Sequence, residues 1–253
     1  MRSLRQITGN NSVQFFNSLI SFMSEFGFVA DKTAQEAYDE MVSGATNAKI
    51  TVNFKWNNDY TIQIQSAAKN ASGSTPDNII IYHSATNLPQ TPIMYSGTGI
   101  SIGENSSINK PTTDGYRHLN AYVVKNDNAW FIQFGSINTT VPDYLTPTKK
   151  PILCSIDNTV IGFLYSTSAF TDSSEINFML KNGTNANITR FYQYRRSNMC
   201  DYSEYVPYFV GGNYTGALKG VINTSYTSLG TYYELENGKN FFEVTAGLAI
   251  VDV

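Results

Sequence analysis

Charged residues are scarce in this chain of 253 residues. Asp, Glu, Lys and Arg make up 15% of it, well below the roughly 25% that is typical of globular domains. A formal net charge of −3 leaves no excess of basic side chains to neutralise phosphates, so the composition excludes a dedicated nucleic-acid binder. No apolar run approaches the roughly 20 residues that span a bilayer, and we expect no membrane partner.

Cysteine and histidine are also scarce, with two of each. Cys154 and Cys200 cannot form a disulfide framework; we expect two buried thiols, and a single bridge is the open alternative. His83 and His118 lack the spacing that places two imidazoles on one metal. Phosphate-binding glycine loops and the nucleophile elbow are missing from the sequence as well. We therefore expect no catalytic residue, no cofactor and no metal, and interpret the protein as a non-enzyme.

Uncharged polarity takes the place of charge. The chain has 26 Asn, 24 Ser and 25 Thr, together with 17 Tyr and 15 Phe. Disordered chains are poor in aromatic residues and rich in charge, so this composition indicates a folded chain with a sizeable core.

The first 44 residues differ from the rest of the chain. Apolar residues recur at spacings of three and four from residue 12 to residue 26, which predicts an amphipathic helix that Asn11 or Ser12 caps and that stops at Gly27. Phenylalanines cover more than one side of this helix, whereas a helix lying on a sheet needs one apolar stripe. We therefore expect a docking element, with interface candidates Phe15, Phe22 and Phe26.

A second helix is predicted directly after the first. Thr33 and Glu36 have the spacing of a capping box, and Gly44 marks the end of the periodic segment. Residues 27–30 would join the two helices, so the predicted N-terminal domain, residues 1–47, is a two-helix hairpin.

From residue 48 onward the period of apolar residues changes to two, which is typical of strands. Asn-rich turns separate the alternating segments, and Asn suits hairpin tips because it tolerates positive φ. The fold class expected is mainly β, with antiparallel hairpins in a sandwich or barrel-like arrangement, and α+β overall once the helices are included. Residues 48–253 form the predicted β-rich domain, with a possible subdivision near residues 146–151. The predicted hairpins are 50–56 with 60–64, 118–125 with 129–134, 151–156 with 159–165, 175–180 with 188–194, and 231–236 with 239–244.

One segment combines arginine and aromatic residues more densely than the rest. Residues 190–196 read RFYQYRR, and Arg and Tyr dominate the hot spots of protein interfaces. An ordinary sheet strand, a subunit interface and a ligand site all remain open for this segment. The interface candidates are Arg190, Tyr192, Tyr194, Arg195 and Arg196.

The C-terminal run, residues 246–253, is largely apolar. An exposed apolar edge strand invites aggregation, so we expect these residues to pair in a sheet, either the chain's own or that of a neighbouring subunit.

Taken together, these features resemble the structural proteins of tailed bacteriophages. The similarity rests on the composition and on the C-terminal stretch from Val206-Pro207-Tyr208-Phe209 to the Asn237-Gly238 hairpin. The resemblance implies a tail, neck or baseplate component that is made and assembled in the host cytoplasm and resides in the virion. Its partners would be further copies of itself and other virion proteins. The alternative is a carbohydrate- or receptor-binding β-module of a phage tail; a glycan hydrolase is less favoured.

Overall fold

The structure of the chain is a computed structural model. It describes residues 2–45, 47–56, 60–66, 78–84, 100–101, 116–135, 152–155, 161–165, 175–179, 184–189, 202–203, 206–224, 232–234, 238, 240–245 and 248–251.

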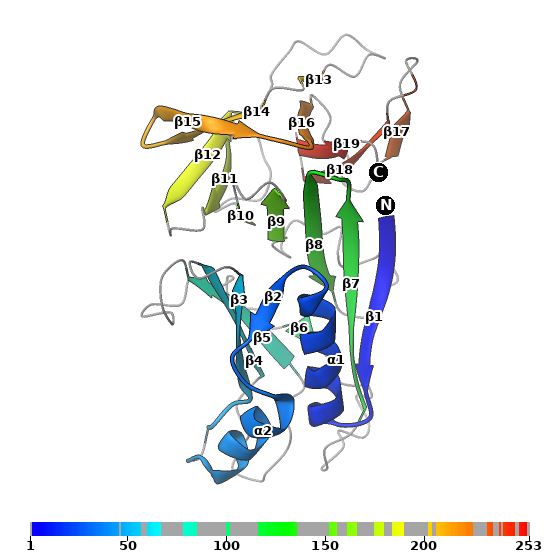
Figure 1. The fold of residues 1–253 in the computed structure, drawn as a ribbon, viewed down its shortest axis with the longest axis vertical. Coiled ribbons are helices and arrows are strands. Elements are labelled where there is room, and N and C mark those ends of the chain that lie inside the picture. Colours follow the sequence, from blue (N-terminus) through cyan, green and yellow to red (C-terminus); the bar gives the residue numbers. More distant parts are fainter. Residues whose placement is uncertain are drawn as a thin grey trace. The chain divides into compact units, whose positions relative to one another are not determined.

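Both predicted helices are confirmed. Helix α1 spans Ser12–Ser24, and the side chain of Asn11 caps it by accepting a hydrogen bond from the backbone N–H of Gln14 at 2.9 Å. Helix α2 spans Ala34–Ser43 and begins with the predicted capping box of Thr33 and Glu36. Two strands were not predicted in this region. They are β1 (Arg2–Gly9), which precedes α1, and β2 (Phe28–Ala30), which lies between the helices (Figure 1).

The remaining described elements are strands. They are β3 (Thr51–Trp56), β4 (Tyr60–Ser66), β5 (Asn78–Ser84), β6 (Ile100–Ser101), β7 (Arg117–Lys125), β8 (Ala129–Gly135), β9 (Ile152–Ser155), β10 (Ile161–Tyr165), β11 (Glu175–Met179), β12 (Asn185–Thr189), β13 (Tyr202–Ser203), β14 (Val206–Val210), β15 (Asn213–Leu218), β16 (Val221–Thr224), β17 (Tyr232–Glu234), β18 (Asn240–Thr245) and β19 (Leu248–Val251).

The strands assemble into antiparallel sheets, so the predicted fold class, mainly β with two helices near the N-terminus, is confirmed. Nine strands are hydrogen-bonded to their neighbours in the order β1-β7-β8-β9-β10-β11-β12-β14-β15. Two five-stranded sheets have the orders β2-β3-β4-β5-β6 and β13-β16-β19-β18-β17. The predicted hairpins β3–β4, β9–β10 and β17–β18 each pair as adjacent antiparallel strands. Strands β11 and β12 pair in the same way, but β12 begins at Asn185, before the predicted start at residue 188.

The chain divides into two compact units, each built from several segments. Unit 1 contains residues 1–4, 122–133 and 145–253, and unit 2 contains residues 5–121 and 134–144. Both helices and the sheet β2–β6 belong to unit 2, and the sheet that holds β19 belongs to unit 1. The predicted domain boundaries at residue 47 and near residues 146–151 remain predictions.

Helix α1 forms part of the core of unit 2. Its apolar residues on more than one side are buried by this chain's own residues, and the ring of Phe22 lies 5.9 Å from that of Phe134 on β8. Phe15 and Phe22 were predicted as docking residues. Both are at most 3% exposed, so an intramolecular contact replaces the expected docking face at these positions. Phe26 is half-buried and packs on Phe22, with ring centroids 5.2 Å apart. The buried side chains of α1 include Phe15, Phe16, Leu19, Phe22 and Met23.

The C-terminal end of α1 is tied to β3 by one side chain. The indole N–H of Trp56 donates to the carbonyl oxygen of Phe26 at 3.1 Å, which satisfies an acceptor near the helix end. Gly27 follows with a φ of +82°, and a Cβ atom there would approach Nε1 of Trp56 to 3.2 Å. Both the left-handed backbone and the nearby indole therefore require glycine at this position.

We expect Phe22→Ala to lower the free energy of unfolding of the full chain by about 3–5 kcal/mol, because it removes a buried aromatic ring from a packed core. Thermal and urea denaturation followed by circular dichroism measures the change. Val42→Ala on α2 is the matched control, since Val42 is 54% exposed and exposed substitutions usually change stability by no more than about 0.5 kcal/mol. A Phe22→Ala protein that melts like the wild type but no longer self-associates would restore the docking interpretation.

Strand β19 lies in the middle of its five-stranded sheet in unit 1. It pairs with β16 on one side and β18 on the other. Ile250 belongs to a buried cluster with Val221, whereas Ala249 belongs to a second cluster with Phe241. Since alternate residues of a strand point to opposite faces, apolar contacts cover both faces of β19. The C-terminal run therefore pairs within the chain's own sheet, one of the two alternatives that the sequence left open.

The side-chain amide of Asn126 connects the β7–β8 turn to this sheet through hydrogen bonds. Its Nδ2 donates to the carbonyl oxygens of Gly220 and Val251, at 2.8 and 2.7 Å. Its Oδ1 accepts from the N–H groups of Asn128 and Ala129, at 2.9 and 2.7 Å. A primary amide has two N–H donors and two acceptor lone pairs. All four are used, so one side chain both closes the turn and holds β16 and β19 against it.

We expect Asn126→Ala to lower the free energy of unfolding by roughly 2–5 kcal/mol, since two carbonyl and two N–H groups lose their partner together. Asn126→Asp should be nearly as damaging at neutral pH, because a carboxylate cannot donate to either carbonyl. Asp127→Asn, at the exposed neighbouring position of the same turn, is the control. Urea denaturation at pH 7 gives the three values, and an Asn126→Ala protein as stable as the control would show that the four bonds are dispensable.

Candidate functional site

One face of the β3–β4 hairpin is polar at every position. Of the alternate positions that point to the opposite side, Val52, Phe54, Trp56, Ile62 and Ile64 are apolar and buried in the core of unit 2, as the two-residue period of a strand allows. We call the polar side the polar face; its residues form the cross-strand pairs Thr51–Gln65, Asn53–Gln63 and Lys55–Thr61.

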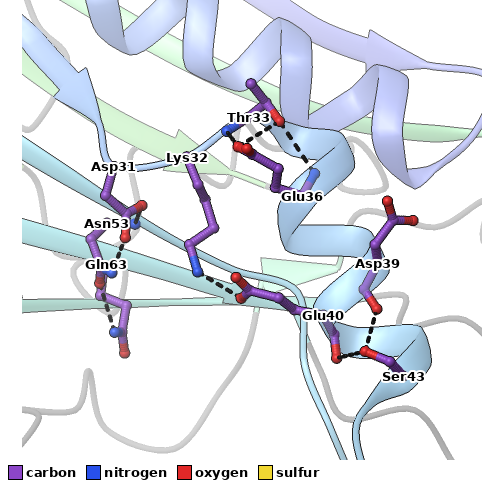
Figure 2. A network of polar contacts seen from close by, with 9 residues as sticks. All are labelled: Asp31, Lys32, Thr33, Glu36, Asp39, Glu40, Ser43, Asn53 and Gln63. Carbon is purple, nitrogen blue, oxygen red and sulfur yellow. Dashed lines mark hydrogen bonds and ion pairs between the residues drawn. The ribbon is translucent and has the colours of Figure 1, made fainter.

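Hydrogen bonds connect three side chains of the polar face to one another and to one further residue at each end. Nζ of Lys49 donates to Oε1 of Gln65 at 3.3 Å, and Nε2 of Gln65 donates to Oε1 of Gln63 at 2.6 Å. Nε2 of Gln63 then donates to Oδ1 of Asn53, and Nδ2 of Asn53 to Oδ2 of Asp31, both at 2.7 Å. We call these five residues the amide chain. It crosses the hairpin from an ammonium group to a carboxylate; Figure 2 shows its carboxylate end.

Asp31 is held in place by the backbone of β3. The N–H of Asp31 donates to the carbonyl oxygen of Asn53, and the N–H of Asn53 donates to Oδ1 of Asp31, both at 2.8 Å. Because Asp31 directly follows β2, these bonds extend the β2–β3 pairing by one residue. The side chain of Asn53 is only 5% exposed, and this reciprocal contact supplies the partners that a buried amide needs.

The start of α2 lies next to the carboxylate end of the amide chain (Figure 2). The backbone N–H and the hydroxyl of Thr33 both donate to Oε2 of Glu36, at 2.8 and 2.9 Å. These bonds, the backbone one first, hold the pKa of the Glu36 carboxyl below its ordinary value. Farther along the helix, Lys32 and Glu40 form an ion pair with 2.6 Å between Nζ and Oε2.

The Glu36 contact makes a small contribution to stability that depends on pH. A carboxyl with a lowered pKa in the folded state stabilises the fold above its unfolded pKa, and this contribution is lost as the pH falls through the folded value. We expect Glu36→Gln to melt slightly below the wild type at pH 7, and the difference to shrink as the pH falls below about 4. Thermal melts from pH 7 to pH 3 measure it. Asp39→Asn, on the same helix, is the control, and a difference that stays constant with pH would contradict this role.

Of the predicted interface residues, the structure describes three, which lie on α1 or directly after it: Phe15, Phe22 and Phe26. Arg190, Tyr192, Tyr194, Arg195 and Arg196 lie outside the described residues. Within residues that the structure does describe, no group of three or more His, Cys, Asp or Glu side chains could hold a metal ion. No helix in that part of the chain is long and apolar enough to cross a membrane. His118 is buried in β7, and its ring lies 5.3 Å from that of Tyr116.

The two-residue period of the sequence predicts the β3–β4 hairpin but not the amide chain. A signal was present, because amides occupy alternate positions on both strands at Asn53, Gln63 and Gln65. The two charged residues at the ends of the amide chain could not be recognised from the sequence. Asp31 reaches the hairpin only through the three-residue strand β2, and Lys49 precedes the first residue of β3.

In comparisons with known proteins, no family model matches the chain, and no curated protein is significantly similar to it.

Proposed function

We propose that this chain is a structural component of a phage virion, of the tail, neck or connector, or baseplate, and that it acts through contacts between subunits. The composition supports this role, since the chain is charge-poor and rich in Asn, Ser, Thr and Tyr. The mainly β fold built from long antiparallel sheets supports it too. In this role the partners are further copies of the chain and other virion proteins, and assembly takes place in the host cytoplasm.

The observation that carries the proposal is the edge strand β15. It is last in the nine-stranded order, and β14 is its neighbour among the described strands (Figure 1). None of its six residues, NYTGAL, is charged, and Asn213, Tyr214 and Thr215 are exposed. Proteins usually protect edge strands with charges, and β15 has none. An uncharged edge is suited to accept a strand from a partner.

The side chains around β15 favour one specific partner over indiscriminate pairing. The ring of Tyr214 packs edge-on against Phe209 of β14, with centroids 6.2 Å apart, and remains 58% exposed. Tyrosine is enriched in interface hot spots because it buries a large area at low entropic cost. Thr215 is the extra residue where the register shifts in the β14–β15 pair. Such a bulge bends the edge, so only a strand of matching curvature fits.

The polar face favours a second candidate function, a carbohydrate- or receptor-binding module of a phage tail. Its amides are fixed by one another and stand on paired strands, and prearranged polar groups of this kind recognise hydrogen-bonding ligands.

Assembly of the purified full-length chain tests the first function. We expect size-exclusion chromatography with light scattering to report an oligomer, and electron microscopy to show particles of defined symmetry. Tyr214→Glu should shift the protein toward the monomer with little change in melting temperature, because it puts a charge on the edge and removes the exposed ring. Val42→Glu, at a residue of similar exposure on α2, should assemble like the wild type. A wild-type chain that stays monomeric at high concentration contradicts the proposal.

A further inference from the structure

The geometry points to the polar face as a binding site for a neutral oligosaccharide, centred on Gln63 and Gln65. This inference rests on the second proposed function, glycan or receptor binding, and is independent of assembly through β15.

The charged ends fix the orientation of every amide in the chain. The ammonium group of Lys49 only donates hydrogen bonds and the carboxylate of Asp31 only accepts them. Each amide between them must therefore accept on the side of Lys49 and donate on the side of Asp31. Bonds aligned head to tail in this way polarise one another, so the three amides are held in one defined arrangement before any ligand arrives.

The amide chain leaves hydrogen-bonding capacity unused. Each primary amide has two N–H donors, and the bonds of Asn53, Gln63 and Gln65 use one Nδ2 or Nε2 donor apiece. Gln63 and Gln65 are partly exposed and Asp31 is exposed. One oriented N–H thus remains on each of the partly exposed amides of Gln63 and Gln65, beside carbonyl oxygens that can accept a second bond, whereas Asn53 is buried. A sugar hydroxyl both donates and accepts, so it matches this alternation of donors and acceptors.

Charge and topology narrow the ligand class to a neutral polyol. The polar face carries Lys55 in addition to the amide chain's Lys49 and Asp31, which leaves one net positive charge, whereas phosphate or sulfate groups need a cluster of basic side chains. Extended peptides bind by adding a strand at a sheet edge. The central hydrogen-bonded residues of β3 and β4 already have strand neighbours on both sides, so side chains carry the recognition here.

A glycan array followed by titration calorimetry with the full-length protein tests the inference. We expect the wild type to retain at least one neutral glycan, with an affinity that changes little between low and high salt, because screening acts on charges. The double variant Gln63→Ala/Gln65→Ala should lose roughly tenfold or more in affinity, since about two hydrogen bonds disappear. Gln35→Ala is the matched control, because Gln35 is an exposed amide on α2 and its loss should leave affinity unchanged.

The possible outcomes distinguish failure of the proposed site from failure of glycan binding as a function. Should the double variant melt well below the wild type, single Gln65→Ala is titrated instead, since it leaves the bond from Gln63 to Asn53 and the bond from Asn53 to Asp31 intact. Retention of a neutral glycan with unchanged affinity in these variants overturns the site but keeps glycan binding. Retention of no neutral glycan, or of only sulfated or sialylated glycans or extended peptides, overturns both.

Discussion

Buried polar groups need hydrogen-bond partners, and in this chain the side-chain amides of Asn126 and Asn53 supply them at a turn and beside a strand. Asn126 uses all four of its hydrogen-bonding positions to hold a turn against two strands. Asn53 accepts from Gln63 and donates to Asp31. An amide donates and accepts without charge, so it satisfies backbone and side-chain groups at little cost in desolvation. A chain with 15% charged residues can therefore satisfy such groups without ion pairs.

Inside each unit, buried apolar side chains stabilise the fold together with these hydrogen-bonded amides. In unit 2, the β3–β4 hairpin separates the two kinds of contact cleanly, with Phe54 and Ile62 in the core and Asn53 and Gln63 on the polar face. In unit 1, β19 is buried on both faces and its end is held through the carbonyl of Val251. The two proposed surfaces, β15 and the polar face, both present uncharged polar groups that are at least partly exposed.

Local signals predicted the helices and hairpins well because the groups that decide them are neighbours in the chain. Asn11 caps α1 three residues away, and Thr33 and Glu36 form their box within one turn. Strand β1 was missed because nothing local distinguishes it; it is a strand through pairing with β7, more than 100 residues later. The role of Phe15, Phe22 and Phe26 was not decided by the sequence for a similar reason, since periodicity shows that α1 is apolar but not which residues cover it.

The sequence by itself determined the period of each element, the caps and the turns, because these depend on contacts over a few residues. Only the tertiary structure decided which residues the exposed and buried faces contact. It placed Phe22 in the core beside Phe134, brought Asp31 to Asn53, and directed Asn126 to hold Gly220 and Val251. At a hairpin tip, asparagine was expected for its tolerance of positive φ, yet here its four hydrogen bonds matter. Such roles depend on groups up to 125 residues apart, and only the closed fold brings those groups together.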